Sequence, residues 1–288
     1  MMTVLKIRQI VISLAVLILH CSVARAEMSD SPAPTTSDIP LGVIDPQLLP
    51  VGYSGQEKLL YDVFWTGGIK IGELSLVVTD LPEVDEGYQI TAVVTTKNGA
   101  VNLIYPIEDV HVTKVRGPNR LPYHYEIWQK EGYRYKAHRV IEFDQEKGSV
   151  RYKKNEKPGD EYDIDGETNN EFSSFFNSRL MPFAIGKKFV VPTFADKKRV
   201  EVIVHAVVQK KIAASILGPV TTVAIMPVMT FKGLYDKKGD TVIYYTDDDC
   251  RVPVRITSKI IIGSLTADLA AYENPACKRY SAVNKEMR

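Results

Sequence analysis

Residues 61–78 read YDVFWTGGIKIGELSLVV, and this stretch decides the fold class. Gly67-Gly68 is a turn dipeptide, and a strand-like pattern resumes at Ile69 and runs to Val78. Before the turn, every second residue is large and apolar, with the period of a β-strand: Tyr61, Val63 and Trp65. The stretch therefore predicts an antiparallel hairpin with one face turned toward a core.

The same alternation recurs along the chain up to about residue 272, at a spacing of roughly ten residues that is typical of antiparallel meanders. Further strands are predicted at 88–94, 123–128, 133–143, 150–152, 200–209, 221–227, 231–235, 241–245, 254–262 and 264–272. We therefore expect a mainly β protein with a single curved antiparallel sheet or half-open barrel and one packed amphipathic helix.

One predicted hairpin carries many aromatic and histidine residues. If Glu131-Gly132 forms a two-residue turn, Trp128 pairs with Tyr135 and Tyr125 pairs with His138. His124 and His138 would then lie on opposite faces of the hairpin, because side chains alternate along a strand. Convergence of the two imidazoles on one metal ion is therefore not expected.

A single helix interrupts the strand pattern. Thr168 and Glu171 have the spacing of a capping box at its start, and Pro182 and Gly186 mark its end. Its apolar residues fall at i, i+3, i+4 and i+8, on one helical face: Phe172, Phe175, Phe176 and Leu180. A short helix with three phenylalanines on one side predicts a plug or lid that lies against the concave side of the sheet.

Residues 1–26 have the composition of a cleavable export signal. Lys6 and Arg8 precede an apolar run from Ile10 to Leu19, and Ala24-Arg25-Ala26 supplies small residues for cleavage. We expect the mature chain to begin at Glu27 and to lie in the periplasm of a Gram-negative bacterium, with outer-membrane association left open.

Two alternatives to cleavage are lipidation at Cys21, which is disfavoured because His20 stands where a small residue is needed, and a retained membrane anchor. Residues 27–52 are rich in Pro, Ser and Thr and predict a flexible tether. Residues 53–288 are expected to form a single β-rich domain with a C-terminal tail and no transmembrane span.

The mature chain keeps two cysteines, Cys250 and Cys277. In an oxidising compartment such a pair usually forms a disulfide, with two free thiols as the alternative. The formal net charge is +1, and loss of three basic residues with the signal would make it −2. A chain without basic excess is not expected to bind nucleic acid.

The residues that could carry chemistry form no recognisable catalytic set. None of the histidines has the spacing of a helical zinc pair, and no nucleophile elbow or phosphate-binding glycine loop occurs. We therefore expect no catalytic residues, no metal and no cofactor. The acidic run Asp247-Asp248-Asp249 is more typical of a solvated turn than of a site.

In their order, several short motifs resemble a bacterial family known as domain of unknown function 3108, over about residues 61–269. The resemblance implies an exported, β-rich protein that faces the periplasm or the outer membrane, and it brings no catalytic residues. Family members usually start the helical segment with Asp, where this chain has Asn170. The residues that carry the resemblance are Tyr61, Val63, Trp65, Gly67, Ile71, Gly72, Thr96, Gly99, Ser173, Arg179, Asp248, Asp249, Arg251, Pro253, Gly263 and Leu269.

Three functional hypotheses follow. The leading one is a non-enzymatic envelope protein that binds a lipid or other amphipathic ligand, or an envelope protein partner, in a groove between sheet and helix. The second is a periplasmic hydrolase or glycan-processing enzyme that uses acids near Asp248, and the third is a purely structural module of an envelope complex. The expected groove residues are Trp65, Trp128, Phe172, Phe175 and Phe176.

Overall fold

The computed structural model describes residues 38–230, 241–260, 263–280 and 282–284. The predicted export signal, the first part of the predicted tether and the predicted strand 231–235 lie outside the described residues.

The described residues form one antiparallel sheet, which confirms the mainly β prediction. The strand order is β8-β7-β6-β5-β4-β3-β2-β1-β14-β13-β12-β11-β10-β9, and β15 pairs with β14. The strands are β1 (Lys58–Trp65), β2 (Ile69–Asp80), β3 (Tyr88–Thr95), β4 (Ile107–Arg116), β5 (Leu121–Glu131), β6 (Tyr135–Asp144), β7 (Ser149–Lys154), β8 (Asp160–Asp163), β9 (Lys188–Ala195), β10 (Lys198–Ile212), β11 (Val220–Thr230), β12 (Thr241–Thr246), β13 (Pro253–Lys259), β14 (Ser264–Glu273) and β15 (Ala282–Asn284), and the helices are α2 (Leu49–Gly52) and α3 (Glu171–Arg179).

The hairpin predicted from residues 61–78 is present as β1 and β2. Trp65 pairs with Ile69, and Gly67 and Gly68 between them have φ angles of +85° and +80°, which glycine adopts without strain. Tyr61 and Val63 are buried on the same face of β1. The alternation of the sequence therefore sets the register, because a slip of one residue would expose this face.

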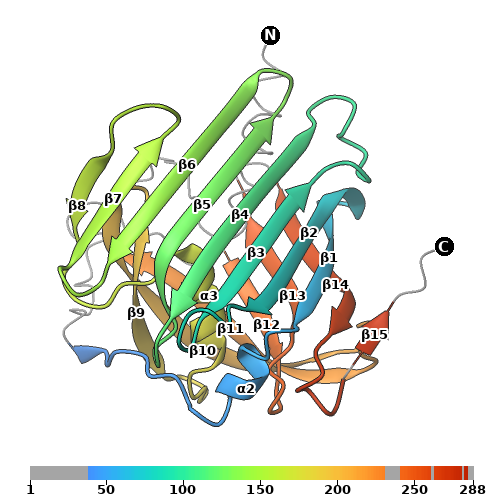
Figure 1. The fold of residues 1–288 in the computed structure, drawn as a ribbon. Coiled ribbons are helices and arrows are strands. Elements are labelled where there is room, and N and C mark those ends of the chain that lie inside the picture. Colours follow the sequence, from blue (N-terminus) through green and yellow to red (C-terminus); the bar gives the residue numbers. More distant parts are fainter. Residues whose placement is uncertain (1–37, 231–240, 261–262, 281, 285–288) are drawn as a thin grey trace, which may run out of the picture.

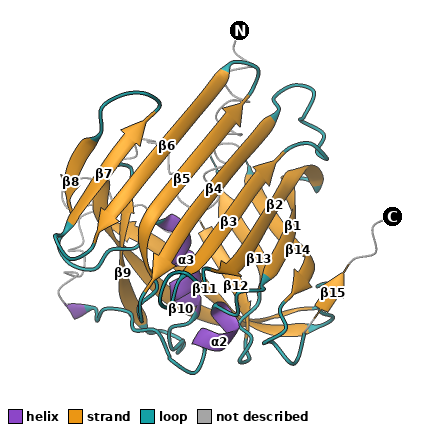
Figure 2. Cartoon of the chain, viewed as in Figure 1, coloured by secondary structure: helices purple, strands orange, loops and turns teal. Residues whose placement is uncertain are grey.

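The sheet curls until its two edges meet. β1 pairs with β14, so the N-terminal strands continue directly into the C-terminal ones, and the two halves face each other across α3 (Figures 1 and 2). At the edges, the ring of Phe194 in β9 packs against Tyr162 of β8 at 5.8 Å and Phe143 at 5.9 Å. The backbone of Asn169, which follows β8, also bonds to this edge: its amide donates to the Pro192 carbonyl at 2.8 Å, and its carbonyl accepts from the Phe194 amide at 2.7 Å. Side chains and this short bridge, rather than a ladder between β8 and β9, close the seam of the predicted half-open barrel.

The described part of the predicted tether is packed against the barrel, which corrects that prediction for residues 38–52. The Gly42 amide donates to the Val190 carbonyl at 2.8 Å, and the Val190 amide donates to the Pro40 carbonyl at 2.9 Å. Leu48 is buried just before α2. The segment thus covers part of the outer edge of β9, where backbone groups would otherwise remain unpaired.

The β5–β6 hairpin differs from its prediction by one turn residue. Its loop is Gly132-Tyr133-Arg134, so Glu131 pairs with Tyr135 and Trp128 pairs with His138. The two-residue turn was wrong because Gly132, with φ of +61°, begins a longer loop. Strands β4, β8, β9 and β15 are additional to the predicted ones.

Candidate functional site

Helix α3 lies inside the barrel, and its N-terminus is capped by Asn170. The Ser173 amide donates to Asn170 Oδ1 at 2.8 Å, and the Asn170 amide donates to Ser173 Oγ at 3.0 Å. Asn170 Nδ2 also donates to Thr113 Oγ1 of β4 at 2.8 Å. The capping box is therefore Asn170–Ser173 and not Thr168–Glu171, because the hydroxyl of Thr168 donates to the carbonyl of Gly166 instead.

The three phenylalanines of α3 are all buried, and they face different walls of the barrel. Phe172 packs against His111 of β4 at 5.1 Å, and Phe176 packs against Tyr53 at 6.4 Å. Phe175 packs against Tyr245 of β12 at 6.2 Å. The helix thus fills the space between the two halves of the sheet, as expected of a plug, but its phenylalanines contact several walls and not a single one.

A narrow apolar cavity remains along one side of the helix. Helix α3 lies against β9 and β4, and the gap remains between α3 and the opposite wall of β10 to β13. The cavity has a volume of about 40 Å³, enough for the end of an apolar chain. We call it the helix slot; its lining is Glu171, Ser174, Phe175, Ser178, Val202, Val204, Pro227, Thr241, Ile243 and Ile256.

Glu171 is the acid of the helix slot. It occupies the first turn of α3, and burial raises the pKa of its carboxyl to about 7. The Arg139 guanidinium partly counteracts this rise. Near neutral pH the carboxyl is therefore divided between its neutral and charged forms, and it can donate or accept a hydrogen bond.

A second acid, Asp109 of β4, is fully buried on the same concave face of the sheet. Burial and the nearby Glu131 carboxylate raise the pKa of Asp109 to about 7. Gln129 connects the two acids, since its Nε2 lies 3.4 Å from Asp109 Oδ2 and 3.1 Å from Glu131 Oε1. Arg139 of β6 donates to Gln129 Oε1.

These interior polar residues were not predicted, but the sequence contained a signal for them. Asp109 shares its strand face with the buried Ile107, and Gln129 shares its face with the buried Ile127. A charged or amide side chain at an inward position of an alternating strand must find partners in the interior. That pattern could have identified both residues.

The C-terminal end of α3 is fixed by a buried ion pair. Arg179 donates to both oxygens of Glu57, at 2.7 and 2.8 Å, and neither side chain is exposed to solvent. Arg179 also donates to the Cys250 carbonyl at 3.0 Å, and Asn274 donates to Glu57 at 3.1 Å. Burial opposes the charge of Arg179, but the attraction of Glu57 outweighs it and raises the pKa of Arg179.

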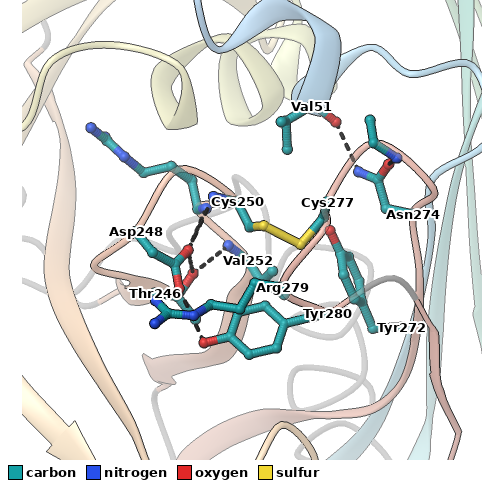
Figure 3. Close-up of a disulfide and its surroundings, with 12 residues drawn as sticks. Val51, Thr246, Asp248, Cys250, Val252, Tyr272, Asn274, Cys277, Arg279 and Tyr280 are labelled. Carbon is teal, nitrogen blue, oxygen red and sulfur yellow. Dashed lines mark hydrogen bonds and ion pairs between the residues drawn. A yellow bond between two sulfur atoms is a disulfide. The ribbon is translucent and has the colours of Figure 1, made fainter.

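The predicted disulfide between Cys250 and Cys277 is present (Figure 3), and the Cys250 carbonyl joins it to the ion pair by accepting from Arg179. Asp248 anchors the turn that precedes Cys250: its Oδ1 accepts from the Thr246 hydroxyl at 2.7 Å and from the Cys250 amide at 3.0 Å. Its other oxygen accepts from Tyr280 at 3.0 Å. The carboxylate of Asp248 is thus used in holding the turn, and its neighbours Asp247 and Asp249 are exposed.

The two tryptophans of the predicted groove occupy different faces of the sheet. Trp65 packs against the core at the end of β1 but does not line the helix slot. Trp128 is 39% exposed on the outer face and stacks on His138 at 5.4 Å. Trp128 is therefore not a groove residue, because the buried, inward positions of β5 are its neighbours Ile127 and Gln129.

The observed pairing of β5 with β6 brings His124 and His138 to one face of the sheet, contrary to the prediction. Glu126 accepts from His138 Nε2 at 2.6 Å and lies 3.4 Å from His124 Nε2, and His124 Nδ1 lies 2.8 Å from Glu142. These four side chains alternate across β5 and β6 on the outer face of the sheet. Within the described ranges, no group of three or more His, Cys, Asp or Glu residues is arranged to hold a metal ion.

The motifs that carried the family resemblance meet in space at two places. Thr96-x-x-Gly99 follows β3 and packs against β2, where a side chain at Gly99 would come within 2.0 Å of the Ile71 carbonyl oxygen. Around the disulfide, the Tyr61 hydroxyl donates to the Pro253 carbonyl at 2.7 Å, close to Arg179. Most of these motifs therefore hold the barrel and its helix together.

The fold and the interior site define a β-barrel-like protein with a helix inside the barrel. The model of the DUF3108 family, described as "Protein of unknown function", matches residues 60–270, so the chain belongs to this family. A search of curated proteins found no match.

Among solved structures, the chain is similar to a β-barrel-like protein of the domain of unknown function DUF1849 from Brucella abortus. The two share 10% sequence identity with a TM-score of 0.50, over 76% of this chain and 97% of that one. This similarity concerns the fold alone. In the part of the chain that the structure describes, no helix has the length and apolar character that a bilayer crossing requires.

Proposed function

We propose that this protein is a non-enzymatic binding protein of the cell envelope, which takes the apolar end of an amphipathic ligand into the helix slot. The observation that carries the proposal is the continuous apolar lining between Phe175 of α3 and the wall of β10 to β13. Of the five residues expected to line a groove between sheet and helix, Phe175 alone lines this slot.

The volume of the slot limits the size of the ligand that can bind without movement of the protein. Sites for whole small molecules usually enclose ~300 to 1,000 Å³, whereas the slot has about 40 Å³. A ligand of lipid size therefore requires α3 to move away from the wall of β10 to β13. Glu171 at the helix N-terminus is placed to hydrogen bond to the polar part of such a ligand.

The test is uptake of a fluorescent long-chain fatty acid by the purified mature protein. Val204→Phe fills the slot, because Val204 lines it from β10. Val200→Phe is the matched control: Val200 is buried on the same face of the same strand but does not line the slot. We expect Val204→Phe to weaken uptake by about tenfold or more, because the phenyl ring occupies the space that the ligand would enter.

The control decides how a loss of uptake is interpreted. Circular dichroism first establishes that both variants fold, since overpacking costs ~1 to 3 kcal/mol. Equal uptake by the Val204→Phe variant and the native chain would contradict the proposal. Native mass spectrometry of protein isolated from cells would then show whether any bound ligand is present.

The periplasm is the proposed location. A disulfide is stable in an oxidising compartment and rare in the cytosol, which supports export. Cell fractionation of a strain that carries the full-length gene tests this directly. Recovery of the protein in the spheroplast cytosol, with Cys250 and Cys277 reduced, would contradict it.

A second candidate function is contact with an envelope protein at one end of the barrel. The β1–β2, β3–β4 and β5–β6 turns lie at this end, since these strands are antiparallel neighbours. Tyr133 donates to the Leu103 carbonyl at 2.6 Å and joins two of the turns. The large apolar side chains exposed here are Ile69, Leu103, Ile104 and Tyr133. Crosslinking in cells should capture a partner with the native chain and lose it with Leu103→Asp.

A further inference from the structure

A second concave surface lies on the outer face of the sheet, away from α3. It is a groove of about 740 Å³ across the ends of β4 to β8. Its floor follows one row of the sheet register, in which Glu142 of β6 pairs with Arg151 of β7, and Arg151 pairs with Glu161 of β8. Acidic and basic side chains therefore alternate along the floor from strand to strand.

The walls of the groove are held by hydrogen bonds of the fold. Gln145 Nε2 donates to the carbonyls of Pro122 and Thr168, at 2.9 and 2.8 Å, and its oxygen accepts from the Thr168 amide at 3.1 Å. On the other side, Asn119 donates to both oxygens of Glu167 at 3.0 and 2.9 Å. The groove is thus formed before any ligand binds.

The lining selects among ligand classes. Five carboxylates and three basic side chains give it a net charge of −2, which disfavours phosphates and other polyanions. Lipid tails are disfavoured too, because the floor consists of charged side chains. Arg116 lies over the ring of Tyr123 at 5.3 Å at one end, so even the aromatic part of the lining is paired with a cation.

We propose that this groove is a binding site for an oligosaccharide that lies across the strands. Carboxylate and guanidinium groups of both charges can accept from and donate to the hydroxyls of a sugar. The repeat of a pyranose chain is close to the spacing of neighbouring strands, ~4.8 Å. Successive sugars would therefore meet Glu142, Arg151 and Glu161 in turn.

The experiment is saturation-transfer difference NMR of the mature protein with soluble neutral, amino and acidic tetrasaccharides. We expect saturable binding of at least one neutral or amino tetrasaccharide. Arg151→Gln and Glu161→Gln should each weaken this binding by about tenfold, because each removes a charged hydrogen-bonding group. Both residues are exposed, so the variants are expected to fold.

Lys153→Gln is the matched control. Lys153 is the next outward residue of β7 after Arg151, it is exposed, and it does not line the groove. Absence of binding by every tetrasaccharide, or an equal loss with Lys153→Gln, would overturn the proposal. Saturable binding of a mixed-charge peptide with no saccharide binding would also overturn it. Fatty acid uptake in the helix slot is a separate readout and does not bear on this outcome.

Discussion

The two ends of helix α3 differ in how the protein accommodates buried charge. At the C-terminal end, Arg179 is paired with Glu57 at two oxygens, and the disulfide loop closes over the pair. At the N-terminal end, the Glu171 carboxyl faces an apolar cavity and has a pKa of about 7. The comparison indicates that the C-terminal end holds the helix in place, whereas the N-terminal end is where a ligand or a change of pH can act.

The largest expected effect comes from breaking the ion pair at the C-terminal end. Glu57→Gln leaves the buried charge of Arg179 without a carboxylate, and the free energy of unfolding should fall by about 3 to 5 kcal/mol. Guanidinium denaturation monitored by circular dichroism measures this change.

Two variants show whether the loss belongs to the buried pair. Lys58→Gln removes the neighbouring ion pair with Glu273, which is exposed on both sides, and should cost less than about 1 kcal/mol. The double variant Glu57→Leu, Arg179→Met should be more stable than Glu57→Gln, because it leaves no buried charge. Equal losses for Glu57→Gln and Lys58→Gln would contradict the assigned role.

The disulfide is the second interaction that stabilises the region around the C-terminal end of α3. Cys250 and Cys277 are 27 residues apart, and replacing both by Ser should lower the free energy of unfolding by ~3.5 kcal/mol. Denaturation of the native chain with and without a reductant provides an independent measurement of the same quantity. A double variant that unfolds at the native denaturant concentration would show that the hydrogen bonds of Asp248 and Asn274 alone hold the loop.

The raised pKa values of the two interior acids predict that the free energy of unfolding depends on pH. Asp109 and Glu171 titrate near pH 7 in the folded chain but near pH ~4 when unfolded. Between these values the folded state retains protons that the unfolded state has lost, so the stability that these two groups contribute is fully present below about pH 4 and is lost as the pH rises through about 7.

Asp109→Asn isolates one of these acids, since the amide stays neutral at every pH. The variant should match the native chain at pH ~4.5 and exceed its free energy of unfolding at pH ~8 by about 3 kcal/mol. Denaturation curves at the two pH values test this. A variant that is less stable than the native chain at pH 8 would show that ionised Asp109 is instead stabilised by its hydrogen bonds from Gln129 and the Lys130 amide.

Local patterns of the sequence predicted the strands and the helix, but not the contacts that join distant segments. The period of two in residues 61–78 and the spacing of three phenylalanines are local properties, and both elements formed as expected. The disulfide was predictable because only two cysteines follow the expected export signal. By contrast, Glu57 and Arg179 are 122 residues apart, and no local pattern links them.

The remaining errors in the predictions arose where the sequence allowed more than one residue or turn length to play the same structural role. Thr168 and Asn170 can both cap a helix, and the bond from Asn170 to Thr113 of β4 favours the second. Gly132 suits a two-residue or a three-residue turn, and the wrong choice paired Trp128 with Tyr135 where the structure pairs it with His138. Asp248 has the chemistry of a catalytic acid, but the turn that contains it uses both of its oxygens.

The smallest effect is expected for Trp128, and it tests whether the site is confined to the interior. Its ring is 39% exposed on the outer face, and its stack on His138 contributes ~0.5 to 1.5 kcal/mol, so Trp128→Ala should destabilise the protein only slightly. Fatty acid uptake should stay within about twofold of the native value. Phe175→Leu, which alters the wall of the helix slot, should change uptake more than Trp128→Ala does. If Trp128→Ala abolished uptake and Phe175→Leu left it unchanged, the binding surface would be the outer face of the sheet, and the contrast between the two ends of α3 would concern stability alone.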